Sequence, residues 1–219
     1  MIADPRDDEA AERPIRRRNS TVTRARILGV AIREFAAKGY EGAGTDEIAD
    51  RARINKRMIY HYFSSKEQLY LAVLEAAYTR ARAAEKKLEV DSLEPLEALR
   101  RLVEFTFDAF AKDRTFISLL ATENLQKARV LKKSARIDEM NSPFIAAIAR
   151  ILARGEAAGV VRPGLDPRQL WISLVGVSYF YFSNVFTLGV VLGTKLDDPD
   201  ILADRRAHVL DFVMQAVRA

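Results

Sequence analysis

The sequence predicts an all-α fold of about nine helices, with a small three-helix domain at the N-terminal end and a larger helical domain after it. Helix-forming Leu, Ala, Arg and Glu dominate, whereas the 219 residues include 10 glycines and 7 prolines. Apolar residues recur at helical spacing, and no segment shows the sustained alternation of a strand. The few helix breakers divide the chain into segments of helical length.

Composition narrows the chemistry that the chain can support. Apolar residues make up 49% of the chain, enough to bury a substantial core. Cysteine is absent, which excludes disulfides and thiolate ligands and fits a reducing cytoplasm. The first 26 residues lack the apolar core of a signal peptide. The two histidines, His61 and His208, lie far apart in sequence, so neither a metal nor another cofactor is expected.

Apolar periodicity places the first well-defined helix. Ile27, Ala31 and Phe35 share one face of a helix that we expect to end near Lys38, with Gly39 as the residue that terminates it. A glycine suits this position because it adopts a positive φ without a steric penalty.

Helix-capping residues mark the segments that follow. Thr45, followed by two acids, is the expected N-cap of a short helix, and Asn55 that of a second. Residues 64–67 read S-x-x-E, a capping box that we expect to open a long helix to about Glu89. Later helix starts are marked by Pro95, Asp113, Asp166-Pro167 and Asp198-Pro199, and Gly159 closes a helix that begins near Ile137 or Ser142.

Residues 45–63 have the pattern of a helix-turn-helix. A helix over 45–52 would meet a second one, starting at Asn55, through a tight corner. Ala49 and Ala52 are small enough for close approach, and three isoleucines would fill the space between the helices. In such a motif the second helix fits the major groove of DNA, and its N-terminal residues reach base edges.

The exposed positions of the second helix carry side chains suited to DNA. Lys56 and Arg57 can pair with phosphates or guanine, and Met58 can touch a thymine methyl. Tyr60 and Tyr62 can donate their hydroxyls to phosphates. The alternative for all three aromatic residues of this segment is packing in the core, and we expect it only for Phe63. The candidate DNA contacts are Thr45, Lys56, Arg57, Met58, Tyr60, His61, Tyr62 and Lys66.

The N-terminal end is strongly charged. Residues 1–12 carry five acids against one arginine, and residues 13–26 carry six arginines and no acid, in a chain of net charge +5. A basic stretch beside a compact segment is typical of proteins that bind polyanions, and an arm containing Arg16, Arg17 and Arg18 could follow a minor groove. The alternative is a solvated, disordered tail.

The stretch from Ile27 to Leu74 resembles the N-terminal domain of the TetR family of bacterial regulators. That family shows F-x-x-x-G-Y/F, then T-x-x-x-I-A-x-x-A-G-V-S, then Y-x-Y/H-F and x-x-K-x-x-L. The combination is far more specific than a helix-turn-helix alone. The matching residues are Phe35, Gly39, Tyr40, Thr45, Ile48 (one position early), Ala49, Ala52, Ile54, Tyr60, Tyr62, Phe63, Lys66, Glu67 and Leu69.

The corner departs from the family pattern, because Arg53 replaces its glycine and Asn55 its serine. Either Arg53 adopts a positive φ at a modest energetic cost, or the corner has another geometry in which Arg53 contacts a phosphate. The resemblance implies three parts: an arm over 1–20, a DNA-binding domain over 21–81 with its helix-turn-helix at 44–63, and an effector-binding and dimerisation domain over 82–219. It also implies a homodimer, a palindromic DNA operator and a small-molecule effector.

The C-terminal part contains no P-loop, dinucleotide fingerprint, nucleophile elbow or H-E-x-x-H motif. Neither a paired acid and base nor a nucleophile points to an enzyme. Aromatic and apolar residues with a few polar groups are typical of a ligand pocket, although core packing explains any single one of them equally well. The candidate pocket residues are Phe105, Phe110, Phe116, Leu120, Glu123, Asn124, Trp171 and Tyr179.

The last two predicted helices, over about 167–190 and 199–217, carry the most apolar surface. In proteins similar to this one, such a helix pair forms a four-helix dimer interface. The candidate interface residues are Val177, Tyr181, Val185, Leu210, Phe212 and Val213. The alternative for residues 169–194, which carry no charge, is a membrane span. Scattered polar residues and aromatics at mid-segment favour a buried helix and no membrane partner.

Overall fold

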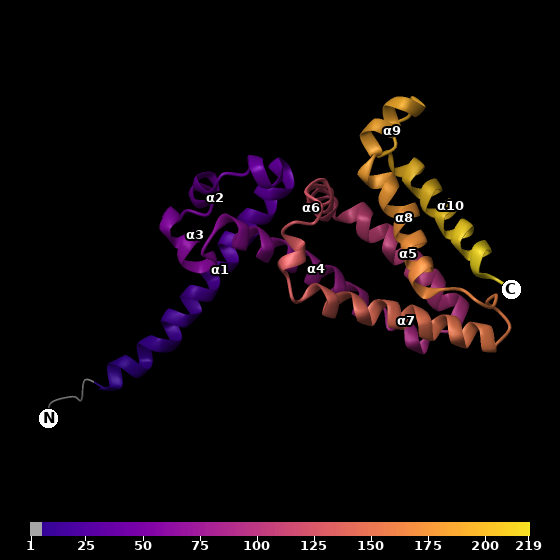
Figure 1. Ribbon diagram of the computed structural model, residues 1–219, viewed down its shortest axis with the longest axis horizontal. Coiled ribbons are helices and arrows are strands. Elements are labelled where there is room, and N and C mark those ends of the chain that lie inside the picture. Colours follow the sequence, from indigo (N-terminus) through magenta and orange to yellow (C-terminus); the bar gives the residue numbers. More distant parts are fainter. Residues whose placement is uncertain (1–5) are drawn as a thin grey trace. The chain divides into compact units, whose positions relative to one another are not determined.

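The computed structural model describes residues 6–219 and the side chains of residues 20–136 and 144–219. Within the described residues it contains ten α-helices and no strand, which confirms the all-α prediction (Figure 1). The helices are α1 (Arg6–Gly42), α2 (Thr45–Arg51), α3 (Lys56–Phe63), α4 (Lys66–Lys86), α5 (Pro95–Lys112), α6 (Arg114–Leu125), α7 (Ile137–Ala157), α8 (Pro167–Ser183), α9 (Val185–Leu192) and α10 (Pro199–Val217).

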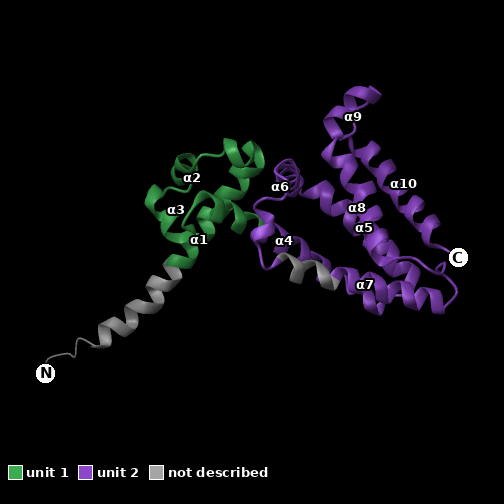
Figure 2. Cartoon of the chain, in the orientation of Figure 1, with its two compact units in different colours: residues 1–74 green, residues 75–219 purple. Residues whose placement is uncertain are grey.

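The chain divides into two compact units, residues 1–74 and residues 75–219 (Figure 2). The division falls within α4, after residue 74, whereas the sequence predicts a boundary between the two domains after residue 81. The expected arm over residues 1–20 lies almost wholly outside the described side chains, and so do its arginines at positions 16 to 18.

Unit 1 is built around the C-terminal half of α1. Ile27 and Phe35 are fully buried, and the Phe35 ring packs against Tyr70 of α4 with ring centroids 4.8 Å apart. The helical geometry of α1 breaks at Gly39, where φ is 69°, so the predicted stop after Lys38 is confirmed. This break turns the chain towards α2 and positions the helices that follow.

Unit 2 is organised around α5, which packs against α7, α8 and α10 (Figure 1). Its inward face buries Leu99, Leu102 and Phe107 in the core. An ion pair fastens α10 to α5, because the Arg206 guanidinium donates to both carboxylate oxygens of Asp108 at 2.8 and 3.2 Å.

The segment predicted as one helix over 167–190 is broken at Asn184 into α8 and α9, which explains why ten helices form and not nine. The two helices meet at an angle of 72°. Among the described residues no single helix is both long and apolar enough to cross a membrane, although this bent pair meets the criteria of length and composition when taken together.

A close approach at Gly155 of α7 joins three segments of unit 2. A Cβ atom built at this position would lie 2.9 Å from Val161 Cβ and 3.2 Å from Pro95 Cβ. The chain after α7 and the start of α5 can reach this helix only because the residue has no side chain.

Replacing Gly155 with Ala should therefore lower the free energy of unfolding by about 1–3 kcal/mol, because the methyl group overpacks this contact. Chemical denaturation monitored by circular dichroism measures the change. Gly29→Ala is the matched control, since a Cβ there meets no atom within 4 Å; it should be neutral or stabilising by up to about 1 kcal/mol. Equal effects of the two substitutions would contradict the packing described for Gly155.

Candidate nucleic-acid interface

The corner between α2 and α3 is a tight turn centred on Arg53. The backbone amide of Arg53 donates to Asp50 O at 3.0 Å, and that of Ile54 donates to Ala49 O at 3.1 Å. Arg53 has a φ of 52°, in the left-handed region that non-glycine residues rarely adopt. The sequence left open whether Arg53 adopts a positive φ or the corner has another geometry. The structure has the positive φ, which is the strained alternative.

Asn55 begins the second helix as predicted. Its side-chain oxygen accepts a hydrogen bond from the Arg57 backbone amide at 2.9 Å, which satisfies one of the amides that a helix start leaves unpaired. Two other caps differ from the prediction by one residue. Gly44 precedes α2 in the N-cap position, so Thr45 is its first helical residue. The cap of α4 is Ser65, whose Oγ accepts from Gln68 N at 3.1 Å.

The helix-turn-helix has the interior predicted for it. Ile48 and Ile59 are fully buried, and Ala49 and Ala52 are almost fully buried between the helices. Phe63 is 4% exposed, as expected of a core aromatic, and the Arg24 guanidinium lies 4.8 Å from its ring centroid. These contacts hold α3 against the rest of unit 1 by one face.

The opposite face of α3 is solvent-exposed. Arg57 and His61, one helical turn apart, are exposed, and Met58 and Tyr62 beside them are half-buried. The side chain of Arg57 forms no ion pair among the described residues. Its five guanidinium donors therefore remain available to a ligand outside the chain.

Tyr60 and Thr45 lie together on one flank of this face. Their hydroxyl oxygens are 3.4 Å apart, so the start of α2 and the middle of α3 present two hydroxyl groups at one place. Lys56, on the same flank, pairs with Asp46 at 2.8 Å, and this hydrogen bond raises the pKa of Lys56 above its ordinary value. From the sequence, Asp46 was expected only as an acid in the first turn of the helix after Thr45, and its pairing with Lys56 was not predicted.

Lys66, the first residue of α4, contacts the last residues of α1. Its Nζ donates to Glu41 O at 3.2 Å and lies 4.9 Å from the ring centroid of Tyr40. The one candidate contact on α4 is therefore held in place by residues of α1 within unit 1.

A buried carboxylate joins α1 to α2. Glu34 is 1% exposed and pairs with Lys38 at 3.2 Å and with Arg51 of α2. Glu47 completes the network, and the hydrogen bond from Lys38 lowers the pKa of the Glu47 carboxyl. A buried charge is tolerated only when it is paired, so this network fixes how α2 lies on α1.

Unit 2 contains a cavity of about 500 Å³ bounded by α4, the 3-10 turn η1 (Val90–Ser92), α5 and α7. Leu102 and Phe144 are among its apolar lining residues. Its charged lining residues are Arg82, Glu85, Lys86, Glu89, Asp91, Arg136 and Arg150. The sequence offered one signal for it: Tyr78, Arg82 and Glu85 continue the inward stripe of α4 that begins with Leu71 and Leu74.

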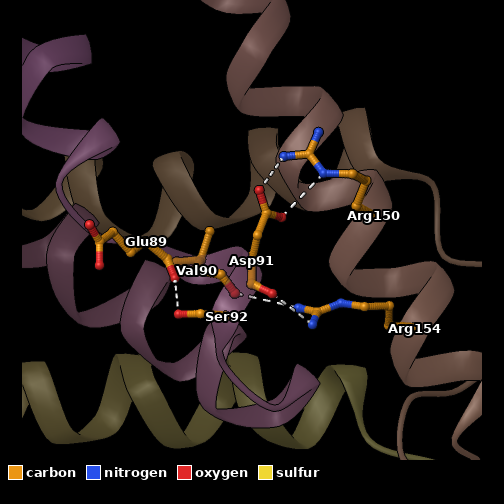
Figure 3. Close-up of polar contacts among 6 residues, drawn as sticks. All are labelled: Glu89, Val90, Asp91, Ser92, Arg150 and Arg154. Atoms are coloured by element: carbon orange, nitrogen blue, oxygen red, sulfur yellow. Dashed lines mark hydrogen bonds and ion pairs between the residues drawn. The ribbon is translucent and has the colours of Figure 1, made fainter.

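Ion pairs organise the charged side of this cavity (Figure 3). Arg150 donates to both oxygens of the Asp91 carboxylate at 3.2 and 2.7 Å, and this pairing lowers the pKa of Asp91. Arg154 donates to the backbone carbonyl of Asp91 at 3.0 Å. Deeper in the cavity, Arg82 pairs with Glu85, and burial raises the pKa of Glu85 to about 7.

None of the eight pocket residues expected from the sequence lines this cavity. Phe110 contacts two of the other seven in an aromatic cluster, with Phe116 at 6.5 Å and Tyr179 at 5.6 Å between ring centroids. Glu123 is buried and accepts from Leu131 N at 3.0 Å, whereas Asn124 is exposed. Phe105, Leu120 and Trp171 are half-buried.

The residues expected at a subunit interface lie in two environments. Tyr181, Val185 and Val213 are buried in the core of a single chain, so they are unavailable to a partner and this part of the prediction needs correction. Val177 and Leu210 are half-buried, and Phe212 is 56% exposed. The large apolar side chains exposed on α8, α9 and α10 are Ile172, Phe180, Phe186, Val190, Val191, Leu192 and Phe212.

Replacing Arg53 with Gly should stabilise the protein by about 1 kcal/mol, because glycine adopts the left-handed conformation without the steric cost of a side chain. Arg53→Ala is the control, since it removes the same charge but keeps the strain. Thermal unfolding of both variants measures the difference. A glycine variant no more stable than the alanine variant would contradict the strained corner.

Comparison with known proteins shows which family this chain resembles. Residues 27–73 match the family model of bacterial regulatory proteins of the tetR family, and residues 95–213 match that of the tetracyclin repressor-like C-terminal domain. The HTH-type transcriptional repressor NicS of Pseudomonas putida is 33% identical over 204 residues, which cover 93% of this chain and 96% of the relative.

Solved structures agree in fold. A putative transcriptional regulator of Streptomyces coelicolor superposes with a TM-score of 0.66 and 27% identity, covering 89% of this chain and 98% of that one. The regulator AibR, solved with isovaleryl coenzyme A and operator DNA, shares the fold with a TM-score of 0.67 at 20% identity, covering 87% and 97% of the two chains. The chain belongs to the TetR family of DNA-binding transcriptional regulators.

Proposed function

We propose that this protein is a dimeric transcriptional repressor that reads a palindromic operator with α3 and leaves it when a small molecule binds in unit 2. The observation that carries the proposal is the exposed face of α3, where Arg57 and His61 point to solvent beside Tyr60 and Lys56. A helix of this size, held from behind by buried Ile59, suits the major groove.

Each candidate contact has a distinct role in this arrangement. Arg57, near the N-terminus of α3, reads base edges, because a guanidinium can donate two hydrogen bonds to guanine. Thr45 and Tyr60 present their adjacent hydroxyls to one phosphate. Lys56 exchanges Asp46 for a phosphate. Met58, His61, Tyr62 and Lys66 complete the contact surface.

The exposed apolar side chains of α8, α9 and α10 support the homodimer. Phe180, Phe186 and Phe212 are each more than half exposed in the single chain, at 57%, 82% and 56%. Large apolar side chains left this exposed in the single chain are typical of an interface. A two-fold dimer would present two copies of α3 about 34 Å apart, one turn of DNA, and would match a palindromic site.

The repressor role is supported by the similarity to NicS, a relative named as a repressor. The effector site is supported by the cavity of unit 2, to which α4 contributes residues 79–86. Because α4 begins directly after α3 and runs into unit 2, ligand binding there can bias the geometry of the DNA-binding unit. The relatives are named regulators, so the proposal assigns no catalytic role and places the protein with DNA in the cytoplasm.

A mobility-shift assay with the region upstream of the protein's own gene tests the proposal. A discrete complex is expected at moderate salt, with a mobility that corresponds to two protein chains per DNA. Failure to form a discrete complex with this region or with any palindromic fragment would refute the proposal.

Replacing Arg57 with Ala should weaken operator binding by about tenfold to a hundredfold, because an arginine–guanine contact contributes about 1–3 kcal/mol. The fold should survive, since the side chain is exposed. Arg100→Ala is the control, because Arg100 lies on α5 and pairs only loosely with Glu97, at 3.8 Å. Titration of labelled operator DNA measures both affinities, and an unchanged affinity of the Arg57 variant would exclude α3 as the reading helix.

A further inference from the structure

We propose that the cavity of unit 2 selects a small organic monoanion, a carboxylate on an apolar body, and holds it through the guanidinium of Arg82. This inference rests on the proposed function, because it takes the cavity to be the effector site. It adds the chemical class of the effector and the residue that recognises it.

Arg82 lies in the wall of the cavity with hydrogen-bond donors to spare. Its side chain is 16% exposed, and its guanidinium carbon lies 5.4 Å from the ring centroid of Phe144. One terminal nitrogen donates to Glu85, but Nε is buried and has no hydrogen-bond partner. An unsatisfied buried donor is costly, more so on a charged group, so the site favours a ligand that brings an acceptor.

The charge of Arg82 is only partly balanced by its neighbour. Burial raises the pKa of Glu85 to about 7, although Arg82 acts in the opposite direction. Near neutral pH a large fraction of Glu85 is therefore uncharged, and Arg82 leaves positive charge in the wall. This favours a negatively charged ligand group beside Arg82.

Among the described lining residues, the remaining acids are engaged or peripheral, whereas not all of the remaining bases are engaged. Both carboxylate oxygens of Asp91 accept hydrogen bonds from the Arg150 guanidinium (Figure 3), and Glu89 is exposed. Among the bases, Lys86 is exposed, and Arg136 pairs only loosely with the described carboxylate of Glu75, at 4.0 Å. Within the wall, a cationic ligand would have to displace Arg150 from Asp91 or Arg82 from Glu85 and would otherwise reach only Glu89 at the exposed rim, whereas an anion beside Arg82 displaces nothing but Glu85.

Glu85 also decides between a monoanion and a dianion. An arginine fork fits carboxylate and phosphate equally well in shape. Arg82 can balance one negative charge, and the second charge of a phosphate dianion would lie without a partner beside the Glu85 carboxyl, which is next to the same guanidinium. The apolar lining, with Leu102 and Phe144 and a volume of about 500 Å³, accommodates a hydrocarbon or aromatic body.

Calorimetric titration of the full-length protein at pH 6 tests the ligand class directly. The probes are 4-phenylbutyrate and octanoate, each against its primary amide, together with phenyl phosphate and 2-phenylethylamine. We expect the carboxylates to bind at least tenfold more tightly than their amides and than the other two probes. Equal binding of the amides, preference for the amine or the phosphate, or no binding of either carboxylate would overturn the proposal.

Two substitutions with opposite expected effects identify the recognising group. Arg82→Met should weaken 4-phenylbutyrate binding by about tenfold or more, the loss expected for a charge-assisted hydrogen bond. Above pH 7, where Glu85 is mostly charged, Glu85→Gln should tighten it several-fold, because it removes the competing carboxylate, and this variant decides the matter if Arg82→Met fails to fold. Arg100→Met is the matched control and should bind as the unmodified protein does. Unchanged binding in both cavity variants would contradict the role of Arg82.

The pH dependence supplies a third readout. A bound carboxylate beside Arg82 favours the protonated form of Glu85, so affinity should be highest below pH 7 and should fall as the pH rises through 7. The other charged groups that face Glu85 across the cavity are Arg82, Lys86, Glu89, Asp91, Arg136 and Arg150. The pH dependence should be absent from Glu85→Gln, and its persistence there would show that another group titrates.

The same probes separate this inference from the proposed function. If 4-phenylbutyrate binds in an Arg82-dependent way but operator DNA stays bound in the mobility shift, the ligand chemistry stands and the release mechanism is wrong. If DNA never binds, the calorimetric result still decides which ligand class the cavity accepts.

Discussion

The surface that we propose to read DNA depends on the sharp corner between α2 and α3, and that corner depends on the left-handed backbone of one residue. With φ at 52°, Arg53 turns the chain so that Asn55 can cap α3 and Ile59 can point back into the core. Such a conformation costs about 1–2 kcal/mol for a residue with a side chain. The surrounding buried contacts, Ile48 among them, supply the stability that holds it.

The two units resolve the same physical problem, a charge removed from water, in opposite ways. In unit 1 the buried Glu34 carboxylate is paired with Lys38 and Arg51, and the result is a rigid junction between α1 and α2. In unit 2 the pair of Arg82 and Glu85 is incomplete, because burial favours the neutral acid and one arginine nitrogen lacks a partner. An ion-paired buried carboxylate fixes structure, whereas a buried donor without a partner beside a cavity suits the ligand that we propose.

The sequence predicts what is locally determined. The all-α class, the stop at Gly39 and the cap at Asn55 follow from short-range rules, and the structure has all three. Prediction fails where two surfaces of similar composition compete. Periodicity marks the segment after residue 167 as apolar but does not say which apolar side chains enter the core, so buried Tyr181 was expected at an interface that exposed Phe186 fits better. The cavity draws its lining from α4, α5 and α7, and only long-range packing brings these together.

The most direct test of the account is selection of double-stranded DNA from a random pool by the full-length protein. A two-fold dimer that reads bases with α3 should enrich an inverted repeat whose half-sites are centred about one helical turn apart. The enriched site should be bound by the protein in the absence of small molecules. Enrichment of a single, non-repeated half-site, or no enrichment above the starting pool, would contradict the account.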